Sequence, residues 1–92
     1  MKTHAIKIVK FPFSLLLSGE KTFEMRFNDR DYQVGDGLIL RETRWDALEM
    51  ERDKPLVYTG REIRAKVTHM LTGPIYGLKE GWVCLSLSVR RD

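Results

Sequence analysis

The sequence predicts a small, mostly-β (α+β) domain, in which about five strands form a strongly curved sheet or barrel with one or two short helices. Most segments alternate apolar and polar residues with a period of two, and turns rich in glycine separate them. The 92 residues, 42% of them hydrophobic, are enough for one packed core and too few for two. We therefore expect a single domain over residues 1–92.

The N-terminal segment predicts a strand followed by a short helix. Residues 5–9 are rich in β-branched side chains, which favour a strand. A helix is expected over residues 11–18, because Pro12 suits a first helical turn and Gly19 suits a helix end. The side chains expected on its core-facing stripe are Phe13, Leu16 and Leu17.

The next strand, over residues 22–28, is the most informative element. Phe23, Met25 and Phe27 alternate with polar residues, so we expect these three large side chains to point toward the core. The polar residues expected on the opposite face are Glu24, Arg26 and Asn28.

The remaining sequence predicts three more strands, over residues 38–42, 62–71 and 82–89. Before the first of them, Gly35 is expected to adopt a positive φ in a tight turn where Asp36 accepts backbone N–H groups. A long loop is expected over residues 45–60, with a helical turn near 47–52. The expected core is Phe23, Met25, Phe27, Leu38, Leu40, Val67, Leu85 and Leu87.

Composition and motifs exclude several classes of function. The net charge of +3 is mildly basic and by itself does not indicate a nucleic-acid partner. The lone Cys84 and the absence of a long apolar run predict a cytoplasmic protein without a membrane partner. No histidine or cysteine set has metal-ligand spacing, and no phosphate loop or nucleophile motif is present. We therefore expect no metal and no cofactor, while the oligomeric state stays open.

Charged and polar residues cluster between positions 21 and 30. Lys21 and Arg26 could hold a phosphate while Glu24 contacts a base edge or moves a proton. The simpler interpretation is a solvated strand face on which Glu24 and Arg26 form a surface ion pair worth ~0–1 kcal/mol. The further ligand-binding candidates of this region are Asn28 and Arg30.

Residues elsewhere in the chain are weaker candidates. Arg64 and Lys66 share one face of a strand and could contact phosphates, although exposed strands often carry such residues. Trp45, in a charged loop, could stack on a base. Lys7 and the strand-end histidine His4 would line the edge of the site, but they fall on opposite faces of a regular strand.

Several motifs together resemble the ASCH domain of the PUA-like superfamily, in particular a small uncharacterised branch from bacteria and their phages. The first motif is Gly19-x-Lys21-Thr22-x-Glu24-x-Arg26, followed by Gly35-Asp36-x-Leu38-x-Leu40. Further similarities are His4-x-x-Lys7, Asn28-Asp29-Arg30, Tyr58-Thr59-Gly60-Arg61-Glu62 and Tyr76-Gly77-Leu78-x-x-Gly81-Trp82-Val83. The resemblance covers nearly the whole chain and implies a five- to six-stranded PUA-like β-barrel with a groove beside the first motif.

The resemblance also implies a function in binding RNA or nucleotides. Some ASCH relatives are nucleases, and one is an amidohydrolase acting on an acetylated cytidine. That amidohydrolase uses a lysine that aligns with Lys21, but it has a threonine where this chain has Glu24.

Three functions therefore compete. The first is binding of RNA, a nucleotide or a modified nucleoside in a polar, basic groove. The second is a small hydrolase or nuclease with Lys21 and Glu24 as catalytic residues, and the third is a protein-interaction module.

Overall fold

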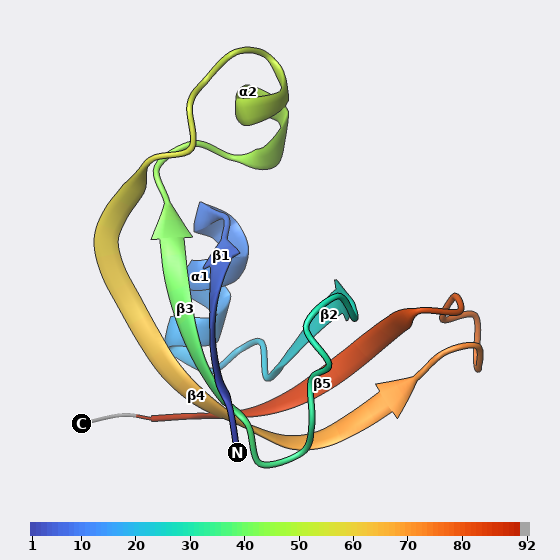
Figure 1. The fold of residues 1–92 in the computed structure, drawn as a ribbon. Helices are drawn as coiled ribbons and strands as arrows, with labels where there is room; N and C mark the ends of the chain where they lie inside the picture. Colours follow the sequence, from blue (N-terminus) through green and yellow to red (C-terminus); the bar gives the residue numbers. More distant parts are fainter. Residues whose placement is uncertain (91–92) are drawn as a thin grey trace.

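The computed structural model describes residues 1–90 and confirms a mostly-β fold of five strands and two short helices. The five strands form one sheet in the order β1-β3-β4-β5-β2, in which only β1 and β3 pair in parallel. The sheet curls into a half-barrel (Figure 1). The elements are β1 (Thr3–Ile8), α1 (Lys10–Ser18), β2 (Phe23–Phe27), β3 (Gly37–Thr43), α2 (Ala47–Glu51), β4 (Tyr58–Thr72) and β5 (Trp82–Val89).

Helix α1 contributes to the core. Phe13 and Leu16 are buried as expected, whereas Leu17 is 43% exposed and lies off the core-facing stripe. Gly19 ends the helix with φ 87°, a left-handed conformation that costs glycine little. The buried hydrophobic residues are Ile6, Ile8, Phe13, Leu16, Tyr32, Leu38, Leu40, Ile63, Ala65, Val67, Val83, Leu85 and Leu87. They form one cluster, so the predicted core positions on β3, β4 and β5 are correct.

The predicted orientation of β2 is wrong. Phe23, Met25 and Phe27 are 42%, 49% and 53% exposed and lie on the convex face of the sheet. The cause is the pairing with β5, which sets Glu24 opposite Leu85 and Arg26 opposite Val83. Cross-strand partners share a face, and both β5 residues are fully buried. Glu24 and Arg26 therefore point into the half-barrel.

Side chains, and not strand pairing, close the gap between the two edge strands β1 and β2. Arg26 donates a hydrogen bond of 3.3 Å from Nη1 to the carbonyl oxygen of Lys7. Arg30, in the segment after β2, donates one of 2.6 Å to the carbonyl oxygen of Ala5. These two carbonyls lie two residues apart on β1, so both point away from β3 along one free edge.

The connection between β3 and β4 is shorter than expected and contains the predicted helical turn. Its helix α2 begins with a capping box, in which Asp46 accepts from the Glu49 N–H and the Glu49 carboxylate accepts from the Asp46 N–H. Strand β4 begins at Tyr58, earlier than predicted, and has a register shift between Val67 and His69. Within residues 1–90, no helix is long and apolar enough to cross a membrane.

Candidate functional site

A groove of about 630 Å³ lies where the open edge of the half-barrel faces the α2 segment. Strand β1 and the start of α1 supply one wall, the β2 strand supplies the charged base, and residues 47–56 supply the outer wall. The lining residues are Lys7, Ile8, Val9, Pro12, Lys21, Glu24, Arg26, Ala47, Met50, Glu51, Lys54 and Leu56.

Lys21, Glu24 and Arg26 form one ion-pair network at the base of this groove. The Glu24 carboxylate accepts from Lys21 Nζ at 2.8 Å and from Arg26 Nη1 at 3.5 Å. The side chains of the three residues are only 19%, 12% and 23% exposed. Partial burial reduces solvent screening, so this network interacts more strongly with a ligand than an exposed ion pair would.

Local structure positions both cations of the network. The helix end at Gly19 lets the Lys21 N–H donate to the Leu15 carbonyl at 3.0 Å, which places Lys21 between α1 and β2. Arg26 is fixed by its place on β2 and by its bond to the Lys7 carbonyl. The two cations thus bind different oxygens of Glu24, Lys21 on Oε1 and Arg26 on Oε2, and Arg26 also reaches the β1 edge.

The groove carries more positive than negative charge. Its lining includes four cations, Lys7, Lys21, Arg26 and Lys54, and two carboxylates, Glu24 and Glu51. Because Glu24 is already paired with two cations, the groove attracts anions. Within residues 1–90, no group of three or more His, Cys, Asp or Glu side chains is placed to hold a metal ion.

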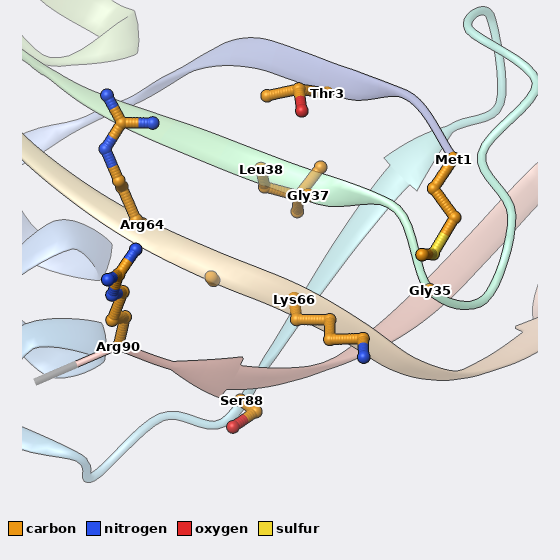
Figure 2. Close-up of a pocket in the computed structure, with 10 residues that line it drawn as sticks. Met1, Thr3, Gly35, Gly37, Leu38, Arg64, Lys66, Ser88 and Arg90 are labelled. Atoms are coloured by element: carbon orange, nitrogen blue, oxygen red, sulfur yellow. The ribbon is translucent and has the colours of Figure 1, made fainter.

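The structure brings together four of the residues predicted for the site, Lys7, Lys21, Glu24 and Arg26. It does not bring Arg64 and Lys66 there, because they lie on the convex face of β4 (Figure 2). Trp45 does not line the groove either. Lys54 Nζ lies 4.5 Å from the Trp45 ring centroid, so a base can stack on that face only after Lys54 moves.

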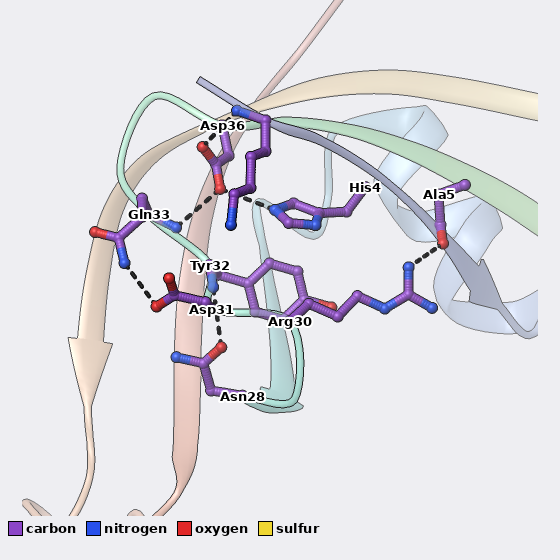
Figure 3. A network of polar contacts seen from close by, with 9 residues as sticks. His4, Ala5, Asn28, Arg30, Asp31, Tyr32, Gln33 and Asp36 are labelled. Carbon is purple, nitrogen blue, oxygen red and sulfur yellow. Dashed lines mark hydrogen bonds and ion pairs between the residues drawn. The ribbon is translucent and has the colours of Figure 1, made fainter.

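Asn28 and Arg30 hold the segment that connects β2 to β3 (Figure 3). Asn28 Oδ1 accepts from the Tyr32 N–H at 3.0 Å, and Arg30 binds the Ala5 carbonyl. Tyr32 is fully buried, and its hydroxyl lies beside Arg26 without a hydrogen bond of ordinary geometry. Burial raises the pKa of Tyr32, while the nearby Arg26 and Arg30 act in the opposite direction. Asn28 and Arg30, both predicted to contact a ligand, therefore have structural roles in this connection.

Asp36 anchors the same connection, also visible in Figure 3. As predicted, Gly35 has a positive φ of 97°, and Asp36 accepts backbone N–H groups, from Gln33 at 3.0 Å and Lys2 at 3.1 Å. His4 adds a contact of 2.8 Å from Nε2 to Asp36 Oδ2, with both side chains buried. The hydrogen bond from His4 is the main cause that lowers the pKa of Asp36 to about 2.

Sequence reasoning missed one residue of the groove and one buried contact outside it. Lys54 reaches the groove from the irregular segment after α2 and has no motif or periodicity to mark it. The pairing of His4 with Asp36 also went unpredicted, because it depends on the alignment of β1 with β3, where His4 lies opposite Leu38. A model of parallel pairing between the first and third strands would have found it.

The fold and the groove define a small half-barrel domain with a basic, partly buried ion-pair site at its open edge. The chain belongs to the family described as a domain of unknown function, DUF3850, which matches residues 3–87. It is also 39% identical over 67 residues to the "Uncharacterized 12.9 kDa protein in GpA 3'region" of Escherichia phage P2. That similarity covers 73% of this chain and 52% of the phage protein, so the chain matches about half of its relative's length.

Proposed function

We propose that this domain binds RNA or a nucleotide, with a phosphate of the ligand held in the groove between β1, β2 and α2. The observation that carries the proposal is the meeting of Lys21 and Arg26, from a helix end and a strand, at the base of one groove, with Lys7 at its β1 edge. Lys21 and Arg26 both bind Glu24, a carboxylate that therefore already has its partners.

The network leaves donors free for a ligand. A lysine ammonium has three N–H donors, and Lys21 uses one of them on Glu24. A guanidinium has five; the contacts of Arg26 with Lys7 and Glu24 involve only its Nη1, and its interaction with Tyr32 draws on at most one further donor. Remaining donors on both side chains can therefore bind phosphate oxygens with charge-assisted hydrogen bonds, which are about twice as strong as neutral ones.

Glu24 has a positioning role in this proposal. Without a carboxylate between them, two partly buried cations on one groove base would repel each other. Glu24 holds Lys21 and Arg26 on its two oxygens, at 2.8 and 3.5 Å. The site is thereby pre-organised before a ligand arrives, which lowers the entropy cost of binding.

The resemblance to the ASCH domain supports the same site. The motif from Gly19 to Arg26 forms the helix end and the charged strand of the groove. A curled, mostly-β sheet is also the architecture which that resemblance implies. An ASCH-type, PUA-like domain that binds RNA accounts for both the motif and the groove.

The contact of 2.8 Å between Lys21 and Glu24 favours a hydrolase as the second candidate. In that function, the Lys21 ammonium binds the carbonyl oxygen of an acylated nucleoside, and Glu24 accepts a proton from the attacking water. The water oxygen bonds to the carbonyl carbon, the carbon–nitrogen bond breaks, and the amine leaves with a proton from Glu24. Product analysis with N4-acetylcytidine tests this candidate.

Calorimetric titration with uridine monophosphate and cytidine monophosphate tests the binding proposal. Lys21→Ala and Arg26→Ala should each weaken binding by ~1–3 kcal/mol, the cost of removing a charged hydrogen bond. Lys79→Ala is the matched control, because Lys79 is exposed in the β4–β5 connection and does not line the groove. Unchanged affinity in both groove variants, or an equal loss in the control, would refute the proposal.

A further inference from the structure

A second basic depression, a trough of about 520 Å³, lies on the convex face of the sheet (Figure 2). Arg64 and Lys66 of β4 border it, together with Arg90 just after β5. Ile63 and Ala65, which alternate with them on β4, are buried, so the two cations point outward. No aspartate or glutamate within residues 1–90 lines the trough, in contrast to the groove.

Gly37 keeps the floor of the trough open. The strand register sets Lys66 between Gly37 and Ser88, and sets Gly37 beside Thr3. The backbone does not require glycine at this position, because its φ lies outside the left-handed region. A Cβ there would lie 3.3 Å from Thr3 Oγ1, within the trough. A glycine inside a strand weakens the strand and often marks the close approach of a ligand.

The two β4 cations have no side-chain partners within residues 1–90. Arg64 and Lys66 form neither an ion pair nor a side-chain hydrogen bond. Three other arginines of the same sheet do pair: Arg26 with Glu24, Arg41 with Glu62 and Arg61 with Glu42. Arg64 and Lys66 lie two residues apart on one face of β4, so their charges repel each other. An anion in the trough would remove this repulsion and occupy the free donors.

The exposed edge of β1 connects the trough to the groove. Thr3 lines the trough and Lys7 lines the groove, and both side chains are on the outward face of β1. They are four residues apart, roughly 13 Å along the strand. Arg30 lies between them on the Ala5 carbonyl. One further cation, Arg30, therefore lies on the path from one depression to the other.

We propose that a single-stranded polynucleotide follows this path, with phosphates on Arg64 and Lys66 in the trough and a terminal or inserted nucleotide in the groove. The path turns from the convex face around the β1 edge to the groove. A flexible single strand can follow that turn, whereas duplex DNA stays nearly straight over roughly 150 base pairs. The inference rests on the proposed function and extends it, because it makes the ligand a polynucleotide and not a free mononucleotide.

Salt-dependent binding of a 16-nucleotide oligouridylate, set beside binding of uridine monophosphate, tests this inference. In Arg64→Gln/Lys66→Gln, the slope of log affinity against log salt should fall by ~1.4, because each phosphate that is no longer neutralised removes about 0.7. Affinity for the monophosphate should stay unchanged, because the groove is intact.

Lys10→Gln/Lys79→Gln removes the same charge outside both depressions and should leave the slope close to that of the parent. Gly37→Ala fills the trough without a change of charge and should weaken binding of the 16-mer alone.

The two proposals fail in different ways. If Arg64→Gln/Lys66→Gln had the same salt slope as the parent, or if the control variant showed the same change in slope, polynucleotide binding in the trough would be refuted. Nucleotide binding in the groove would be unaffected by that result. If that variant lost binding to phosphatidylserine vesicles but kept binding of the 16-mer, the trough would be a site for lipid headgroups. This result would also refute polynucleotide binding in the trough. Absence of monophosphate binding in the parent, with the slope change present, would refute the groove and support the trough.

Discussion

The guanidinium of Arg30 lies 2.6 Å from the main-chain carbonyl oxygen of Ala5, across the gap between the two edge strands of the half-barrel. With the bond from Arg26 to Lys7, it holds the free edge of β1 in a sheet that does not close by strand pairing. The groove lies at this same edge, so its width depends on these side-chain contacts.

Removal of the Arg30 contact should loosen β1. Arg30→Gln should cost ~0.5–1.5 kcal/mol of unfolding free energy, because the hydrogen bond that it removes is exposed to solvent. Amide hydrogen exchange of residues 4–8 should accelerate, and chemical denaturation gives the free energy. Arg52→Gln is a control at an exposed position. Equal stability and exchange in Arg30→Gln and the parent would mean that the contact does not close the edge.

Acid should destabilise the protein through Asp36. Its pKa is about 2 in the fold against an ordinary 3.8, so the folded state keeps this carboxylate ionised after the unfolded chain has bound a proton. The stabilisation is complete above pH 3.8 and is lost as the pH falls toward 2. Between about pH 4 and pH 2, the free energy of unfolding should therefore fall less steeply in Asp36→Asn than in the parent.

Asp31→Asn is the matched control for this pH dependence, since Asp31 is an exposed aspartate of the same connection. Parallel stability curves for Asp36→Asn and the parent over that acidic range would show that the contact with His4 does not favour the ionised carboxylate.

The orientation of β2 predicts a large difference between two truncations. Phe23→Ala should cost only ~1 kcal/mol, because much of that ring is already in solvent. Leu85→Ala on the neighbouring strand should cost ~2–5 kcal/mol, because Leu85 is fully buried. Denaturation midpoints measure both. A cost for Phe23→Ala as large as that for Leu85→Ala would place Phe23 in the core and restore the orientation expected from the sequence.

Glu24→Gln separates the binding function from the hydrolytic one. Loss of the carboxylate releases Lys21 and Arg26 from the positions in which Glu24 holds them, so affinity for uridine monophosphate should fall by up to about tenfold, or ~1.4 kcal/mol. In a hydrolase, the same substitution should abolish turnover of N4-acetylcytidine, since the proton acceptor is gone. Nucleotide binding in Glu24→Gln as tight as in the parent, without any turnover of N4-acetylcytidine by the parent, would contradict both the positioning role of Glu24 and the hydrolase.

Local patterns were sufficient for most of the secondary structure and insufficient for the face of β2. The period of two correctly separates Phe23, Met25 and Phe27 from Glu24 and Arg26, but alternation does not say which set faces inward. That choice depends on the pairing with β5, a strand distant in sequence. The ion-pair network stabilises Glu24 and Arg26 in their inward positions. A search of the sequence for apolar faces cannot detect such a network.

The site was predictable where a compact motif carried it and unpredictable where distant segments meet. Lys21, Glu24 and Arg26 lie close together in sequence and share one local geometry, set by the helix end at Gly19 and the strand that follows. Lys54 joins them only through the three-dimensional path of the β3–β4 connection. The contact of His4 with Asp36 likewise needs the parallel alignment of β1 and β3.

The central claim is that the groove holds a nucleotide phosphate, and amide chemical-shift mapping during titration with uridine monophosphate tests it most directly. The account predicts saturable shifts concentrated at Lys7, Lys21, Glu24, Arg26 and Lys54, which need a higher ligand concentration in Lys21→Ala and are unchanged in Lys79→Ala. Saturable shifts centred on the exposed apolar face of Phe23, Met25 and Phe27, or no saturable shifts at all, would contradict it.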